Sequence, residues 1–156
     1  MIGQEEVQKS FSKYNHLGLP NPGTLCYLIA ILQSFYSMKK LREHLIQVSE
    51  NSSEGHEESI LRREKVRYSY AIGSILQAIK NGVDSKIKEL LLKDLASMLF
   101  DEEHSVKKGE HEDLLNVLNF ILLQLKKEDK NIARFYEIKS RKWCECGSLR
   151  KNMIYR

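Results

Sequence analysis

The chain's two prolines stand in a six-residue stretch that also contains two glycines, and this stretch constrains the fold most. It runs from Gly18 to Gly23, with Pro20 and Pro22 inside it. Because proline donates no backbone hydrogen bond and glycine favours turns, the stretch predicts a tight loop that interrupts regular structure. The apolar pattern of a helix begins directly afterwards. Cys26 is therefore predicted to lie where a helix starts.

A cysteine at a helix start has two interpretations. Unpaired backbone N–H groups and the positive end of the helix dipole favour an anion there, and the thiolate is the reactive form of cysteine. On this interpretation Cys26 is a nucleophile. The alternative is that Cys26 is a small buried apolar residue, which is the usual fate of a free cysteine.

The residues around Cys26 resemble the Cys box of the ubiquitin-specific proteases, which are papain-like cysteine deubiquitinases. The family pattern reads Gly-Leu-x-Asn-x-Gly-Asn-Thr-Cys-Tyr-Met-Asn-Ser-x-Leu-Gln. The chain agrees with it at Gly18, Leu19, Asn21, Gly23, Cys26, Tyr27, Leu32 and Gln33, and departs from it at Thr24, Leu25, Leu28, Ile29 and Ala30. The resemblance implies that Cys26 is the nucleophile. It also implies that the Asn21 amide belongs to the oxyanion hole, where it would stabilise charge on the attacked carbonyl oxygen.

A second segment, residues 110–127, has apolar residues in uninterrupted i, i+3, i+4 order and predicts a helix. Its charges suit the helix dipole, with Glu110, Glu112 and Asp113 in the first turn and Lys126 and Lys127 in the last. It resembles the family's block Gly-x-Gln-Gln-Asp-Ala-x-Glu-Phe-Leu in pattern more than in identity. The resemblance implies that Asp113 contacts the basic tail of ubiquitin, while Asn116 replaces the family's second acid. The alternative is that Asp113 serves only the helix N-terminus.

The remaining patterns predict a mainly α fold. Helices are expected over 26–37, 39–46, 59–80 and from Asp84 or Ser85 to 99, separated by polar loops at 49–58 and 101–109, and the partly alternating residues 132–143 suit a strand. The family resemblance implies the helical thumb of a papain-like α+β protease, ending in a short strand that begins the fingers. We expect a lead-in over 1–17, a helical thumb-like domain with the Cys box over 18–127, and a strand with the start of a fingers-like segment over 128–156.

Two cysteines near the end of the chain, Cys144 and Cys146, resemble half of the zinc ribbon in the family's fingers. They form Cys-x-Cys where the family has Cys-x-x-Cys, and no second pair follows. Structural zinc requires four ligands in tetrahedral geometry, which two thiols cannot supply. We therefore interpret the pair as a vestigial half zinc site and expect no zinc and no other cofactor.

Composition describes one ordinary globular domain. The chain has 156 residues, 42% hydrophobic and 29% charged, with a net charge of +4 from mixed basic and acidic residues. Neither this charge nor the basic, tyrosine-containing stretch from Arg62 to Tyr70 predicts nucleic-acid binding, because interspersed acids make a solvated face the simpler interpretation. The acidic residues from Asp101 to His104 are likewise expected to be solvated rather than to bind a cation. Three cysteines, no apolar run of membrane length and no signal-peptide pattern favour an intracellular, cytoplasmic or nuclear protein.

The family's Gly-His-Tyr block, which carries the general base, has no counterpart in these residues. His16 precedes Cys26 by ten residues and is expected to be a surface residue, since the family's catalytic histidine lies far downstream. A cysteine nucleophile needs a base and a leaving-group acid. The prediction is thus a cysteine deubiquitinase, truncated and inactive alone, whose partner is ubiquitin or a ubiquitinated protein. The alternatives are a catalytically inactive ubiquitin-binding or interaction module, and a helical domain with a chance Cys box.

Overall fold

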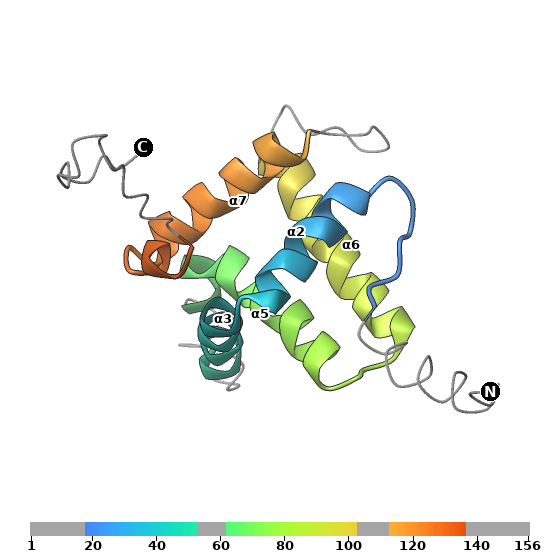
Figure 1. Cartoon of the computed structure of the whole chain (residues 1–156), viewed down its shortest axis with the longest axis horizontal. Helices are drawn as coiled ribbons and strands as arrows, with labels where there is room; N and C mark the ends of the chain where they lie inside the picture. The colour runs from blue at the N-terminus through green and yellow to red at the C-terminus, as the bar shows by residue number, and fades with distance from the viewer. Residues whose placement is uncertain (1–17, 53–61, 103–112, 137–156) are drawn as a thin grey trace, which may run out of the picture.

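The computed structural model describes residues 18–52, 62–102 and 113–136, and the regular elements in these ranges are all helical (Figure 1). The mainly α prediction is confirmed. Residues 62–65 are also helical, and the longer elements are α2 (Cys26–Ser37), α3 (Lys39–Asn51), α5 (Arg67–Lys80), α6 (Ser85–Glu102), α7 (Leu114–Glu128) and the 3-10 helix η1 (Ile132–Phe135).

Helix α5 is the element around which the others pack. It contacts α2, α3, α6 and α7 (Figure 1). Its apolar residues Ile72, Ile75 and Leu76 are fully buried, together with leucine and isoleucine side chains of the other helices. Burying each such side chain contributes roughly 1.5–3 kcal/mol, so this shared core is the main source of stability.

Gly73 allows α3 and α5 to approach closely. A Cβ atom at this position would lie 2.1 Å from the Leu45 carbonyl oxygen and 2.9 Å from the Ser49 Cβ. Beside this contact the Ser49 and Ser74 hydroxyls share a hydrogen bond of 2.9 Å. Ser49 is therefore buried, which explains why α3 continues to Asn51 although residues 49–51 belong to a predicted loop. The rest of that loop lies outside the described residues.

The helix predicted over 59–80 is interrupted at Val66, where the backbone leaves helical geometry. Glu128, at the end of α7, accepts hydrogen bonds of 2.8 Å from the backbone N–H groups of Tyr68 and Ser69, and one of 2.6 Å from the Ser69 hydroxyl. A helix start leaves such N–H groups unpaired. A carboxylate some 60 residues away in sequence thus makes a new helix start possible, and local sequence patterns do not reveal it.

The predicted ends of the other helices mostly lie close to the observed ends. Gly82 has a positive φ of 63° after α5, and the Asp84 carboxylate accepts from the Lys86 N–H at 2.8 Å, as expected of a cap. Helix α6 extends to Glu102, beyond the predicted residue 99 and into the predicted loop. None of the described helices is long and apolar enough to cross a membrane.

The beginning of the predicted strand is wrong. Residues 132–135 form η1, and the Asp129 carboxylate accepts from the Asn131 N–H at 2.8 Å before it. Ile132 and its neighbour Ala133 are both buried, whereas a strand would point them to opposite faces. Residues 137–143 of that prediction lie outside the described residues, as does the lead-in 1–17.

Candidate functional site

Cys26 is the first residue of α2, as predicted, and its side chain is exposed. The following residues Tyr27 and Leu28 are buried in the core. The buried side chains of Tyr27 and Leu28 therefore hold the helix start in place, while the Cys26 thiol faces solvent. This exposure contradicts the alternative that Cys26 is a small buried apolar residue.

The loop before Cys26 is exposed at Gly18, Asn21 and Gly23, half-buried between them, and anchored at its end. Gly23 has a φ of 143° and open space where a Cβ would lie, whereas Leu25 is buried. The Leu25 carbonyl accepts the Ile29 N–H at 3.0 Å, which starts α2 without a side-chain cap. Asn21 lies exposed in the same loop. The sequence-predicted nucleophile and oxyanion residue therefore share one short, outward-facing segment.

Lys88 ties the start of this loop to α6. Its side chain is buried, at 2% exposed, and its Nζ donates a hydrogen bond of 3.1 Å to the Gly18 carbonyl oxygen. A buried ammonium group is costly unless it is paired, so such a position is unusual for lysine. The sequence prediction missed Lys88. The available signal was its helical register with Leu92, Leu95 and Leu99, which are all buried.

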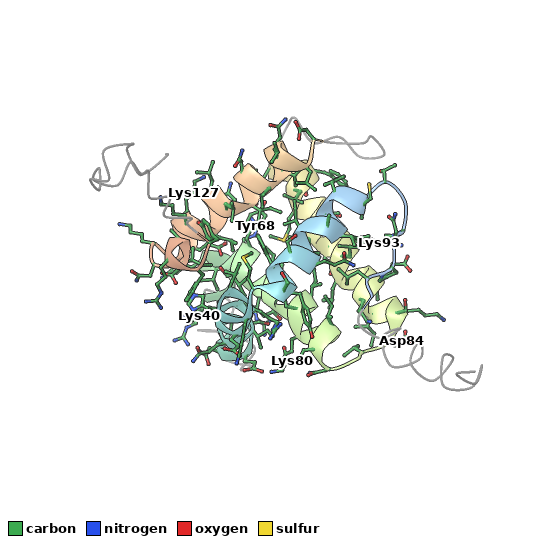
Figure 2. All side chains as sticks on the ribbon, in the orientation of Figure 1. Lys40, Tyr68, Lys80, Asp84, Lys93 and Lys127 are labelled. Carbon is green, nitrogen blue, oxygen red and sulfur yellow. The ribbon has the colours of Figure 1, made fainter. Side chains whose placement is uncertain are left out.

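A cavity of about 410 Å³ lies between the loop and α6. The loop side consists of residues 22–25, and the α6 side is lined by Lys93, Ala96, Ser97 and Phe100. Figure 2 shows Lys93 on the part of α6 next to the loop. Leu25, which lines the cavity, directly precedes Cys26, so the cavity lies one residue from the exposed cysteine along the chain.

Asp113 caps α7 instead of lying within its first turn. Its carboxylate accepts the Leu115 N–H at 2.8 Å and is exposed. Helices α2 and α7 pack against each other and run in the same direction in Figure 1, so their N-termini lie at the same end of the protein. Capping fits the helix-only interpretation of Asp113, and exposure leaves its second oxygen available for a ligand.

His44 is the one histidine among the described residues, and it lies on α3, which follows the end of α2. Its Nε2 is 3.0 Å from an Asp129 carboxylate oxygen, and its ring lies 5.1 Å from that of Phe135. This pair fastens the segment after α7 to α3, at the far end of α2 from Cys26. His16 and the other three histidines lie outside the described residues. The described part of the chain thus places no imidazole at Cys26.

The basic stretch before and within α5 makes contacts inside the fold. Arg63 donates from Nε to the Ser52 carbonyl at 2.7 Å and lies over the Tyr70 ring, while Arg67 pairs with Glu102 at 2.7 Å. Tyr68 is buried and donates from its hydroxyl to Glu102 at 3.0 Å. These contacts favour a structural role for the stretch.

No group of three metal-ligating side chains occurs within the ranges that the structure describes. Cys144, Cys146, Glu103 and His104 lie outside them. The interpretation of the two cysteines as a vestigial half zinc site therefore stays a prediction.

Comparison with known families matches residues 17–153 to the ubiquitin carboxyl-terminal hydrolases. Comparisons with curated proteins and with solved structures find no match. The family match spans most of the chain, and the mostly helical structure is consistent with a helical part of that fold. The chain therefore belongs to the ubiquitin carboxyl-terminal hydrolase family, whose members act on ubiquitin or ubiquitinated substrates.

Proposed function

We propose that this chain carries the nucleophile half of a cysteine-type deubiquitinase active site. The observation that carries the proposal is the exposed Cys26 thiol at the start of α2, preceded by the Cys-box loop. A helix start with no side-chain cap and no acidic residue in its first turn favours negative charge at this point.

In the proposed reaction, the Cys26 sulfur attacks the carbonyl carbon that joins the ubiquitin C-terminus to a lysine amine. A C–S bond forms, the carbonyl oxygen becomes an oxyanion, and the C–N bond then breaks. The amine takes up a proton as it leaves, and water later hydrolyses the thioester to release ubiquitin and the thiol. Each bond change therefore requires a proton donor or acceptor near Cys26.

Asn21 and Asp113 have supporting roles in this proposal. The Asn21 amide N–H donates to the oxyanion from the exposed loop, a contact of the kind that is typically worth about 3–4 kcal/mol in enzymes with preorganised donors. The exposed Asp113 carboxylate binds the basic tail of ubiquitin while still capping α7. Asp113 caps the start of α7, and Asn21 lies in the loop that leads into α2.

The presence or absence of a proton acceptor near Cys26 distinguishes two candidate functions. His44, the one described histidine, is paired with Asp129 beyond the end of α7. If a base comes from outside the described residues, the site is catalytic. Without one, the same surface is a ubiquitin-binding module, and the exposed acid at Asp113 favours this as the second candidate.

A ubiquitin derivative with a thiol-reactive group at its C-terminus tests the first candidate. We expect the intact mass to increase by one ubiquitin and the increase to vanish in Cys26→Ser. A Cys144→Ser/Cys146→Ser double variant is the matched control and should still react, because it retains Cys26. A folded protein that gains no mass is not a working protease.

Binding measurements test the second candidate. Ubiquitin binding that persists in Cys26→Ala and weakens in Asp113→Lys supports a binding module. Asp113→Asn is the matched control. Its side-chain oxygen can still cap α7, so weaker binding in this variant reports the lost charge and not a lost cap. Absence of ubiquitin binding in all folded variants contradicts both candidates and leaves a helical domain with a chance Cys box.

A further inference from the structure

The cavity between the Cys-box loop and α6 has no part in the roles assigned above. Its volume of about 410 Å³ lies in the range of ordinary ligand sites, which are concave, largely apolar and contain a few polar groups. We call it the Cys-box cavity, lined by residues 22–25 together with Lys93, Ala96, Ser97 and Phe100. Its wall at Leu25 is one residue from Cys26 along the chain.

The Cys-box cavity and the start of α7 lie on different sides of α2. Helix α7 packs against α2, whereas the loop that forms one cavity wall lies on the other side of α2 in Figure 1. The proposed contact for the ubiquitin tail, Asp113, belongs to the α7 side. The cavity is therefore available to the other half of the substrate, the polypeptide whose lysine is joined to ubiquitin.

The lining indicates what such a polypeptide must present. Pro22, Leu25, Ala96 and Phe100 offer apolar surface, and Gly23 leaves open space where a side chain would stand. Lys93 is half exposed and pairs with Glu89 at 2.6 Å. An exposed pair of this kind is weak, and an ammonium has three donors, so Lys93 can bind a second carboxylate.

We propose that the Cys-box cavity receives an apolar side chain next to the ubiquitin-bearing lysine of the substrate, and that Lys93 binds an acidic residue on the other side of that lysine. This specificity site rests on the proposed function, because it needs Cys26 to be the point of attack. It goes beyond that function by defining the substrate sequence that the chain prefers.

Short peptides that react directly with Cys26 test the cavity without ubiquitin. The probe is acetyl-Leu-Lys-Glu-amide with a chloroacetyl group on the lysine Nε, and its partner has Gly in place of Leu. The Cys26 sulfur displaces chloride, a C–S bond forms as the C–Cl bond breaks, and the thiol proton passes to buffer. In the Cys144→Ser/Cys146→Ser background, we expect the Leu peptide to react about tenfold faster, as burial of one such side chain permits.

Two matched pairs of variants locate the effect. Ser97→Trp fills the cavity from an exposed position and should bring the Leu-to-Gly rate ratio close to one, whereas Gln47→Trp on the exposed face of α3 should leave it unchanged. Lys93→Glu should remove the preference for the Glu peptide over one ending in Lys. Lys86→Glu, exposed on the same helix, should retain that preference.

A Leu-to-Gly ratio near one in the parent chain overturns the proposal, and so does a ratio that Ser97→Trp leaves intact. If Ser97→Trp loses its helical circular dichroism, the Lys93→Glu comparison decides in its place, and an unchanged preference there overturns the proposal. Because ratios of peptide rates cancel the intrinsic reactivity of the thiol, a chain that fails with the ubiquitin reagent can still show them. Failure of the enzyme function and failure of the cavity are thus separate results.

Discussion

The α3–α5 contact and the Cys-box loop are held to the protein by different means. At the helix contact, Gly73 brings one backbone against another, and the hydroxyl of the buried Ser49 shares a hydrogen bond with that of the half-buried Ser74. The loop from Gly18 to Leu25 joins the body at Lys88 and at its buried last residue, and Asn21 and Cys26 face solvent. We infer that changes at the first region alter stability, whereas changes at the second alter reactivity.

Gly73→Ala should break the helix contact and produce the largest effect. The new Cβ would meet the Leu45 carbonyl oxygen at 2.1 Å, so the helices must separate. We expect the free energy of unfolding to fall by roughly 3 kcal/mol, which is the upper range for overpacking a core, despite alanine's better helix propensity. Urea denaturation measures it. A loss below about 0.5 kcal/mol, the usual range for surface changes, would show that the contact is not close-packed.

Glu128→Ala tests the second structural contact, the long-range cap of α5. It leaves the N–H groups of Tyr68 and Ser69 without the carboxylate that accepts from them. We expect a loss of roughly 2 kcal/mol, and about half of that for Glu128→Gln, which retains one acceptor oxygen. Burial raises the pKa of the Glu128 carboxyl more than its hydrogen bonds from Ser69 and Tyr68 lower it.

The matched control is Glu43→Ala, which removes an exposed carboxylate paired with Lys39 at 4.0 Å. A change within about 0.5 kcal/mol is expected for such a surface pair. Equal effects of the Glu43 and Glu128 substitutions would contradict the assignment of Glu128 as the cap. In that case local sequence alone, and not Glu128, would cause the interruption of the helix at Val66.

Lys88→Met, in contrast, should lower the reactivity of Cys26 more than the stability of the protein. Methionine retains the apolar stem in the buried position but cannot donate to the Gly18 carbonyl. We expect the ubiquitin reagent to label Cys26 about tenfold more slowly, since small misplacements of reacting groups cost rate, while stability changes by only about 1 kcal/mol. Lys86→Met is the exposed control on the same helix. A parallel fall of stability and labelling would assign Lys88 to the core instead of the site.

The same division explains what the sequence could predict. Local patterns identified the Cys-box loop, the start of α2 at Cys26 and the Asp84 cap, because each depends on a few neighbouring residues. They missed the break at Val66, the continuation of α3 past Ser49 and η1, because Glu128, Gly73 and buried neighbours impose these from a distance. The burial of Lys88 was available from its helical register, but its contact with the Gly18 carbonyl and the Cys-box cavity were not. This contact and the cavity form only where α6 packs beside the loop.

The smallest effect concerns alkaline pH at Tyr68, which joins the start of α5 to α6. Burial and the hydrogen bond to Glu102 raise the pKa of the Tyr68 phenol above its ordinary value near 10. The unfolded chain therefore loses this proton first. Stability from Tyr68 is complete below pH 10 and declines as the pH rises above it. Figure 2 labels Tyr68 among the packed helices.

Tyr68→Phe removes this titration. Its stability deficit relative to the parent should be roughly 1 kcal/mol at pH 8, from the lost hydrogen bond, and should shrink by a similar amount by pH 11. Urea midpoints at pH 8, 9, 10 and 11 measure the difference. A deficit that stays constant over this range would mean that Tyr68 titrates alike in both states. The polar contacts at the start of α5 would then add little to stability, as is expected of the Cys-box loop and not of the α3–α5 contact.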